Sequence, residues 1–269
     1  WLLLQPRGHL GGYFLYAALV FAAVGMVFIA FTGKASIQYP GFTGWSFEDP
    51  NTGAISPLFP MLSITIACGA CSGFHCLIAS GTTSKQLRRE SDSKIIGYGA
   101  MLMEAMVAIV SLACVMMLTN QQGIDLRDRP NLIYAQGLGR FMESFGISMA
   151  FGVVFGLLAF TTFVYDTLDV CTRLGRYIVQ ELTGLSGAAG RLIGTAITAG
   201  IPVIFIIKPQ LDAQGNPQPA WKVFWNLFGA SNQLLAALAL IGITVWLWRT
   251  YRAKWVWPVL GLPTVFMYV

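Results

Sequence analysis

The residues best suited to chemistry lie in one apolar stretch, which runs from Pro57 to Ser84 and reads PLFPMLSITIACGACSGFHCLIASGTTS. It contains no Asp, Glu, Lys or Arg, yet it carries glycines, cysteines, hydroxyls and the imidazole of His75. In a membrane, polar groups at mid-depth need neighbouring helices or a water-filled cavity to satisfy them. The pattern therefore indicates a pathway for a solute more than a simple anchor.

His75 has two interpretations. It is either a core histidine bonded to a neighbouring carbonyl, or a proton-binding or substrate-binding group whose charge changes near neutral pH. Gly69, Gly73, Thr82 and Thr83 are poor helix formers that give the backbone room to unwind. Unwound membrane helices bind substrates and coupling ions in transporters, so this setting favours the second interpretation.

The cysteines of this stretch raise the question of a metal site. Cys68, Cys71 and Cys76 surround His75 in CGACSGFHC, which supplies ligand types that zinc accepts. On one helix, Cys68, Cys71 and His75 share a face at i, i+3 and i+7. A structural zinc site normally joins separate knuckles, however, and all of these residues fall in one candidate span. We therefore interpret the cysteines as small packing residues and predict neither a metal nor a cofactor.

Glu104 is a carboxylate well inside the apolar run GYGAMLMEAMVAIVSLACVMML. Burying it ionised is costly, so it has to face the interior of the bundle, pair with a cation or carry a proton. Two interpretations stay open. Glu104 is either part of a proton relay or the structural partner of Lys85 or Arg88.

Two further segments combine polar and apolar residues. In TTFVYDTLDVCTRLGRYIVQEL, the i, i+4 spacing of Asp169 and Arg173 predicts a structural ion pair. Hydroxyls and a carboxylate can replace the hydration of a cation or bond a polar substrate. The predicted pathway residues of this segment are Thr161, Thr162 and Asp166.

In the second segment, KVFWNLFGASNQLLAALALIGITVWLW, the amides of Asn232 and Gln233 stand near one end of an apolar run. Amides in lipid readily hydrogen-bond between helices, which makes packing one interpretation. A gate or a binding surface is the other.

The composition identifies the elements that must position these groups. Of 269 residues, 55% are hydrophobic and 11% are charged, and the mean hydropathy is +0.63. Soluble domains have roughly 45–50% apolar and roughly 25% charged residues, so an integral membrane protein is expected. Each apolar run has roughly the 20 residues that a membrane helix needs, which predicts an all-α, polytopic transmembrane helix bundle. The candidate spans lie near 10–32, 57–84, 95–119, 144–165, 192–207 and 223–248, with another beginning at 255–269.

The net charge of +5 fits membrane orientation better than nucleic-acid binding. Most of the 17 Lys and Arg residues fall in one set of alternate loops, which predicts that this set is cytoplasmic. The loop at 120–140 is then expected on the outer side. The first residue is Trp1 and the last residues are hydrophobic, which favours an internal fragment of a longer protein.

Several long segments resemble the carbon starvation protein A family. They are the stretch from Pro57 to Leu87 with the following IGYGAMLMEAMVAIVSL, the opening WLLLQPRGHL, TTFVYDTLDVCTRLGRYIVQEL and FWNLFGASNQLLAALAL. The resemblance covers nearly the whole chain. It implies a prokaryotic inner-membrane transporter of peptides or, in a close branch, of pyruvate by proton symport. It also implies broken helices like those of the amino acid, polyamine and cation transporter superfamily. Residues 1–120 are expected in the main family domain and 121–269 in a five-helix C-terminal domain, with an N-terminal half missing.

The leading hypothesis is a secondary transporter for peptides or pyruvate that uses the proton gradient in the response to carbon starvation. The helix at 57–84 unwinds near Gly69 to Gly73, its backbone and His75 face the substrate, and Glu104 or Asp166 exchanges protons. The expected partners are this small substrate, protons and the lipid bilayer, and no nucleic acid is expected.

Two alternatives come from other classes of protein. One is a starvation-linked membrane sensor or structural component. The other is an intramembrane enzyme that uses a Cys and a His, although no oxyanion-hole motif or orienting carboxylate stands nearby. No nucleotide-binding or metalloprotease motif occurs in the sequence, so we expect a transporter and not an enzyme.

Overall fold

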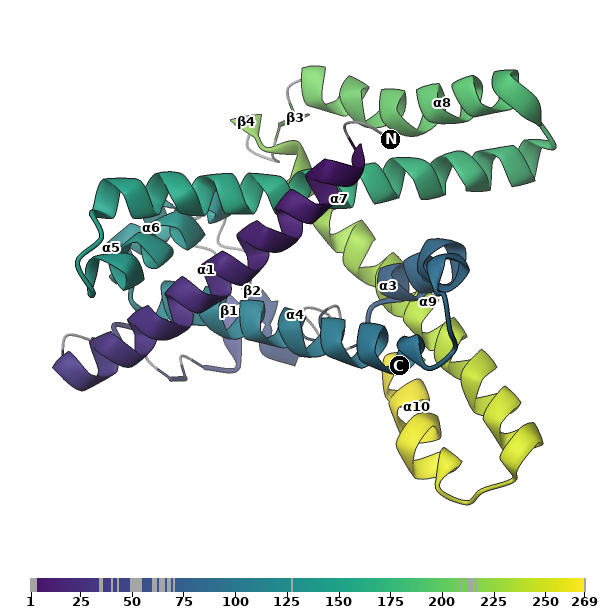
Figure 1. The fold of residues 1–269 in the computed structure, drawn as a ribbon, viewed down its shortest axis with the longest axis horizontal. Helices are drawn as coiled ribbons and strands as arrows, with labels where there is room; N and C mark the ends of the chain where they lie inside the picture. The colour runs from purple at the N-terminus through teal and green to yellow at the C-terminus, as the bar shows by residue number, and fades with distance from the viewer. Residues whose placement is uncertain are drawn as a thin grey trace. The chain divides into compact units, whose positions relative to one another are not determined.

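The chain is predominantly helical, as predicted (Figure 1). The computed structural model describes residues 4–33, 36–39, 41–42, 44–48, 55–59, 62, 66, 69, 71–126, 128–208, 210–211, 215 and 217–268. Within this part of the chain, five helices are long and apolar enough to cross a membrane: Pro6–Thr32, Asp92–Met116, Met149–Thr183, Gly187–Ile207 and Ala220–Tyr251. A helix satisfies its own backbone polar groups, which is why apolar runs of this length fold in this way in lipid.

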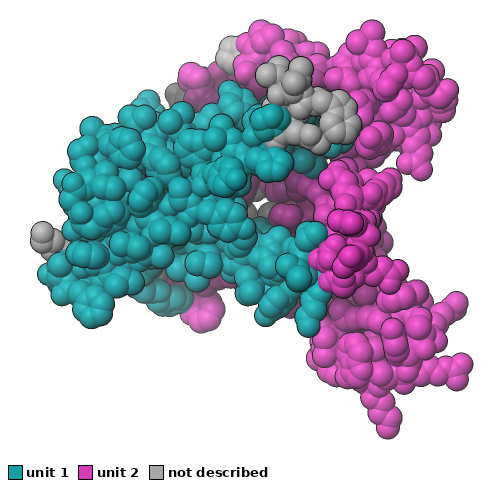
Figure 2. Space-filling model, in the orientation of Figure 1, with its two compact units in different colours: residues 1–42, 94–173 teal, residues 43–93, 174–269 magenta. Residues whose placement is uncertain are grey.

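The structure divides into two compact units, drawn in different colours in Figure 2. Unit 1 comprises residues 1–42 and 94–173, and unit 2 comprises 43–93 and 174–269. The helices of unit 1 are α1 (Leu4–Thr32), most of α4 (Asp92–Met116), α5 (Asn120–Asp125), α6 (Pro130–Glu143) and the first part of α7 (Met149–Thr183).

Helix α6 lies at the centre of unit 1. Its residues Leu138, Phe141 and Met142 are buried and form one core with α1 and α4. The approach of α1 is close, since a Cβ added at Gly25 would lie 2.5 Å from the carbonyl oxygen of Phe141. Small residues let membrane helices approach in this manner, and α6 therefore fixes the spacing of the longer helices.

The connection at 120–140, which the sequence places on the outer side of the membrane, is not irregular, because it contains α5 and the greater part of α6. At 14 residues, α6 is roughly 21 Å long, too short to register as a membrane span. Its local signal is Pro130 at the first helical turn, where proline is favoured. Helix α7 starts at Met149 and continues to Thr183, beyond the span predicted near 144–165.

Unit 2 contains shorter elements around one long helix. They are β1 (Ser46–Glu48), β2 (Ile55–Pro57), α3 (Gly73–Ile78), a π-helical turn (Ala79–Thr83), a 3-10 turn (Ser84–Gln86), the end of α7, α8 (Gly187–Ile207), β3 (Gln210–Leu211), β4 (Pro217–Gln218), α9 (Ala220–Tyr251), a second π-helical turn (Trp257–Gly261) and α10 (Leu262–Tyr268). Strands β1 and β2 pair antiparallel, as do β3 and β4. Both α3 and α10 pack on α9, where Ala236, Ala237 and Met267 are buried.

The end of α7 and helix α8 form a hairpin in unit 2 (Figure 1). Gly184 and Gly187 have φ of 68° and 74°, a left-handed backbone that glycine adopts without strain and that turns the chain between the two helices. A Cβ added at Gly194 would lie 3.1 Å from the carbonyl oxygen of Arg176, so the two helices are in close contact. Helix α8 begins five residues before the predicted span at 192–207 and contains Pro202.

The span predicted at 57–84 is not one continuous helix. Pro57 belongs to strand β2, and Ser72 has an extended backbone with φ −81° and ψ 125°. Helix α3 begins only at Gly73. The described backbone thus departs from a helix at Ser72, within the Gly69 to Gly73 segment where the sequence favoured unwinding.

Candidate functional site

The start of α3 is formed by a serine cap. The hydroxyl oxygen of Ser72 accepts a hydrogen bond from the backbone N–H of His75 at 3.3 Å. This bond occupies one of the N–H groups that the first turn of a helix leaves without an intrahelical partner. Ser72 therefore marks the point where the chain changes from extended to helical.

A buried amide from α9 holds this change of backbone in place. Asn232 is 4% exposed, and its Oδ1 accepts hydrogen bonds from the Ser72 hydroxyl at 3.0 Å and from the Phe74 N–H at 2.8 Å. One acceptor thus satisfies both the capping hydroxyl and another N–H of the first turn. The predicted site residues Gly73 and Asn232, 159 positions apart in the sequence, meet here.

Gly73 allows α3 and α9 to touch through their backbones. A Cβ added at Gly73 would fall against the carbonyl oxygen of Asn232 and the Cβ of Leu235, and 2.7 Å from the N of Ala236. Backbone atoms cannot turn aside as the end of a long side chain can. Glycine is therefore required at this position.

The next residue of α9 holds a different element. Gln233 donates a hydrogen bond from Nε2 to the carbonyl oxygen of Met267 in α10 at 3.0 Å. Asn232 and Gln233 thus bind α3 and α10 from consecutive positions of one helix. Both make the interhelical hydrogen bonds that the packing interpretation of these amides predicts.

The remaining predicted residues of this segment lie before, within and after α3. The side chain of His75 is exposed on α3, and Gly69 is helical and exposed. Thr82 and Thr83 lie in the π-helical turn Ala79–Thr83, where the hydroxyl of Thr82 donates to the carbonyl oxygen of Ile78 at 2.8 Å. Single π turns are frequent at functional sites because they break the regular hydrogen-bond ladder.

Cys71 and His75 do not lie on one continuous helix, as the shared helical face required. Cys71 precedes the start of α3, Cys76 lies within it, and both are free thiols of intermediate exposure. Cys68 lies outside the described residues. Among the residues that the structure describes, no group of three His, Cys, Asp or Glu side chains is arranged to hold a metal ion.

Unit 1 contains a polar contact of a different kind, which is charged. Arg7 of α1 lies 3.4 Å from Asp166 and 3.6 Å from Asp169, both on α7. Asp169 also pairs with Arg173 at 3.1 Å, which confirms the predicted i, i+4 pair. The four side chains alternate in charge in the order Asp166, Arg7, Asp169, Arg173, and we call them the charge ladder. Each is between 28% and 36% exposed.

The ladder sits where α1 comes close to α7. A Cβ added at Gly11 would fall against Oδ2 of Asp166 and lie 3.4 Å from Cγ2 of Thr162. These two predicted pathway residues therefore lie on the α1 side of α7. Thr161 is exposed at the neighbouring position of the same helix. The Nε of Arg7 is buried and has no hydrogen-bond partner among the described residues.

The predicted site residues thus fall into two groups. Glu104, exposed on α4, belongs to unit 1 with Thr161, Thr162 and Asp166, and the others belong to unit 2. Sequence reasoning missed Arg7, Gly11 and Ser72. Ser72 carried a local signal, since serine directly before a helical segment is a preferred cap. Arg7 carried none beyond its charge, because its partners lie about 160 positions away.

The fold and these contacts define a multi-pass membrane protein with polar groups on its candidate spans. The family description Carbon starvation protein CstA matches residues 1–133 and 119–269. The chain belongs to this family of prokaryotic membrane proteins. No solved structure matches the chain.

Three relatives illustrate the range of the family. The peptide transporter CstA of Helicobacter pylori (strain J99) is 30% identical over 310 residues, which cover 94% of this chain and 44% of the relative. The pyruvate/proton symporter BtsT of Escherichia coli (strain K12) is 30% identical over 348 residues, covering 100% of this chain and 47% of the relative. The peptide transporter CstA of the same strain is 29% identical, with coverage of 100% and 46%. The chain therefore spans a little under half the length of these relatives.

Proposed function

We propose that the chain is part of a secondary active transporter that takes up peptides or pyruvate together with protons across the prokaryotic inner membrane under carbon starvation. The relatives are named as peptide transporters and as a pyruvate/proton symporter, which supports a transporter role for the family. The division of the chain at residue 120 into a main family domain and a five-helix C-terminal domain is part of the same proposal.

The observation that carries the proposal is the interrupted backbone at Ser72 and Gly73. It stands in an apolar stretch, and the buried amide of Asn232 holds it in one arrangement. Interrupted membrane helices present backbone N–H and C=O groups to substrates and ions. His75 is exposed within one turn of the interruption, where it is able to meet an anionic or zwitterionic solute.

The charge ladder is the proposed site of proton exchange. A proton taken up by Asp166 removes the negative charge that faces Arg7, and Arg7 then keeps only its contact with Asp169. Release of the proton on the other side of the membrane restores the first pair. A carboxylate that alternates between these states couples the position of α1 against α7 to proton binding.

Uptake by full-length protein in proteoliposomes tests the proposal. Radiolabelled peptide and pyruvate are offered with an inward proton gradient and again after an ionophore has dissipated it. We expect uptake of at least one solute only with the gradient. Equal uptake in both conditions rejects proton coupling, and no uptake of either solute favours the sensor or structural alternative.

Two substitutions test the proposed pathway residues in the same assay. We expect His75→Ala and Glu104→Gln each to reduce uptake while the protein stays folded. Normal transport by both variants would remove these two side chains from the mechanism.

A further inference from the structure

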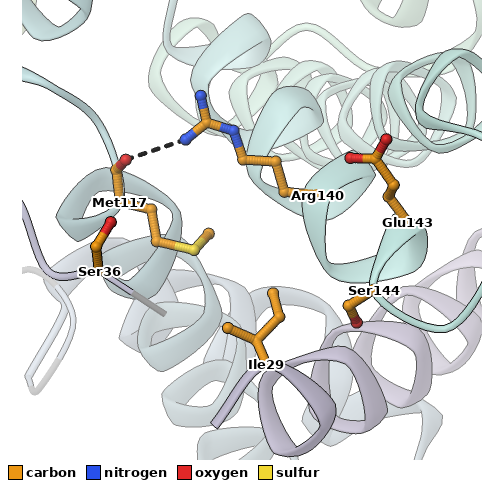
Figure 3. Close-up of a pocket in the computed structure, with 6 residues that line it drawn as sticks. All are labelled: Ile29, Ser36, Met117, Arg140, Glu143 and Ser144. Atoms are coloured by element: carbon orange, nitrogen blue, oxygen red, sulfur yellow. Dashed lines mark hydrogen bonds between the residues drawn. The ribbon is translucent and has the colours of Figure 1, made fainter. Parts of the chain in front are cut away.

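A cavity of about 460 Å³ opens in unit 1, apart from the charge ladder. Figure 3 shows the six residues that line it: Ile29, Ser36, Met117, Arg140, Glu143 and Ser144. Its volume falls in the range of roughly 300–1,000 Å³ that is usual for small-molecule sites. The cavity is therefore large enough for a solute the size of a small peptide.

Arg140 supplies a positive charge held in a fixed position. Its guanidinium donates to the carbonyl oxygen of Met117 at 3.0 Å and to Oε1 of Gln122 at 3.4 Å. In the part of the chain that the structure describes, both of these hydrogen-bond partners are neutral. Arginine remains charged at any physiological pH, and its fork of donors matches a carboxylate.

Ser36 adds a donor on the same side of the cavity (Figure 3). Its hydroxyl oxygen accepts a hydrogen bond from Nε2 of Gln38 at 2.7 Å. Because a hydroxyl has one proton to give, Ser36 keeps that proton for another acceptor. The side of the cavity formed by Arg140 and Ser36 therefore offers donors to a carboxylate.

The opposite side offers acceptors. Glu143 is exposed and diverges from Arg140, although both project from α6 (Figure 3). Ser144 donates its hydroxyl proton to the carbonyl oxygen of Phe141 at 2.6 Å, so its oxygen presents only lone pairs elsewhere. A carboxylate and a hydroxyl oxygen suit an ammonium group. Between the two sides lies Ile29, which is 7% exposed and apolar.

The cavity also lies where a solute would arrive. Met117 comes directly after the candidate span that ends at Met116, and Ser36 lies four residues after the span that ends at Thr32. The loop that follows Met116 is the one that the Lys and Arg distribution predicts on the outer side of the membrane. A site here would meet external solute before it enters the membrane.

We propose that this cavity binds small zwitterionic peptides, with the peptide carboxylate at Arg140 and Ser36 and its ammonium group at Glu143 and Ser144. The proposal rests on the proposed transport function and assigns it a substrate class. A keto acid such as pyruvate has a carboxylate but no ammonium group. A bound keto acid would give Glu143 no counter-charge and would bring its own carboxylate close to that of Glu143, which disfavours binding of the keto acid.

Equilibrium binding to full-length protein in nanodiscs tests the site. The probes are the dipeptide L-Ala-L-Ala, its N-acetyl derivative, its C-terminal amide, and pyruvate. We expect the dipeptide to bind about 10- to 100-fold more tightly than either blocked derivative, because each derivative loses one charge-assisted contact. Equal binding of the dipeptide and both derivatives, or tighter binding of pyruvate, would overturn the proposal.

Substitutions then connect each end of the ligand to its residue. Glu143→Gln should abolish the preference for the dipeptide over its N-acetyl form. Arg140→Gln should abolish the preference for the dipeptide over its C-terminal amide. The matched control is Arg129→Gln, which removes a positive charge from the exposed start of α6 outside the cavity and should keep both preferences. Arg140 also bonds the backbone of Met117, and its removal affects folding as well as binding. If Arg140→Gln does not fold, the outcome is decided by Glu143→Gln and by the ligand series.

Proton-driven uptake by the same protein separates the two proposals. If Glu143→Gln keeps both normal uptake and the preference for the dipeptide over its N-acetyl form, the cavity proposal is rejected and the transport function stands. Selective binding of the dipeptide to this cavity without proton-driven uptake would reject the transport function and keep the site.

Discussion

Two polar contacts between helices, one in each unit, are built from different chemistry. In unit 2, α3 meets α9 through a hydroxyl, a backbone N–H and a buried amide, all neutral. In unit 1, α1 meets α7 through charged groups that are about one-third exposed. Neutral hydrogen bonds in a buried contact need close geometry and respond little to salt. Exposed ion pairs tolerate wider spacing but respond to salt and to protonation. The first contact suits a fixed element, and the second suits a switch.

The largest expected difference in stability between the two contacts comes from a matched pair of glycine substitutions, one in each contact. Gly73→Ala places a Cβ against backbone atoms of α9, and we expect a loss of about 3 kcal/mol in stability or a loss of folded protein. Gly11→Ala meets the end of the Asp166 side chain, which is able to turn away, and should cost about 1 kcal/mol. Thermal unfolding in detergent measures both. Equal stability of the two variants would contradict the distinction between a rigid contact and an adaptable one.

Removal of the central acceptor of unit 2 should have the next largest effect. Asn232→Leu keeps the approximate volume but leaves the Ser72 hydroxyl and the Phe74 N–H without their partner, and we expect about 2 kcal/mol of destabilisation. Ser72→Ala removes only the cap and should cost about 1 kcal/mol. The difference in unfolding midpoint between Asn232→Leu and the unsubstituted protein should change little between low and high salt, because the lost contact is neutral. A strong salt dependence would show that the contact is not the neutral one described.

Asp166→Asn is expected to separate stability from function. The substitution removes one carboxylate that faces Arg7 while Asp169 remains, so stability should fall by no more than about 1 kcal/mol. Proton-driven uptake in proteoliposomes should be lost, since an amide does not exchange protons at physiological pH. Proton-driven uptake at the level of the unsubstituted protein would remove Asp166 from the coupling.

The smallest effect is expected at Arg173, the last member of the charge ladder. Arg173→Gln removes an i, i+4 pair that is about one-third exposed, which should cost about 0.3–0.5 kcal/mol. Thermal unfolding at low and high salt should show this difference shrinking as salt screens the pair. A loss as large as that of Asn232→Leu would mean that the pair is not the weak surface contact inferred from its exposure.

Local patterns allowed part of the site to be predicted. The spacing of Asp169 and Arg173 predicted their pair because residues four apart on a helix are neighbours wherever the helix lies. Gly69 and Gly73 indicated an irregular backbone, and the described chain does leave the helix at Ser72. In contrast, α6 was not predicted, because its length is below that of a membrane span and its burial depends on α1 and α4.

The sequence by itself determined the membrane class, the approximate candidate spans and the family resemblance, because these depend on hydropathy over windows of about 20 residues and on local order along the chain. The tertiary structure decided which polar groups meet. Arg7 pairs with Asp166, and Asn232 accepts from Ser72, across about 160 residues in each case. Such contacts depend on how helices pack at glycines such as Gly73, and a single sequence carries no local signal of that packing.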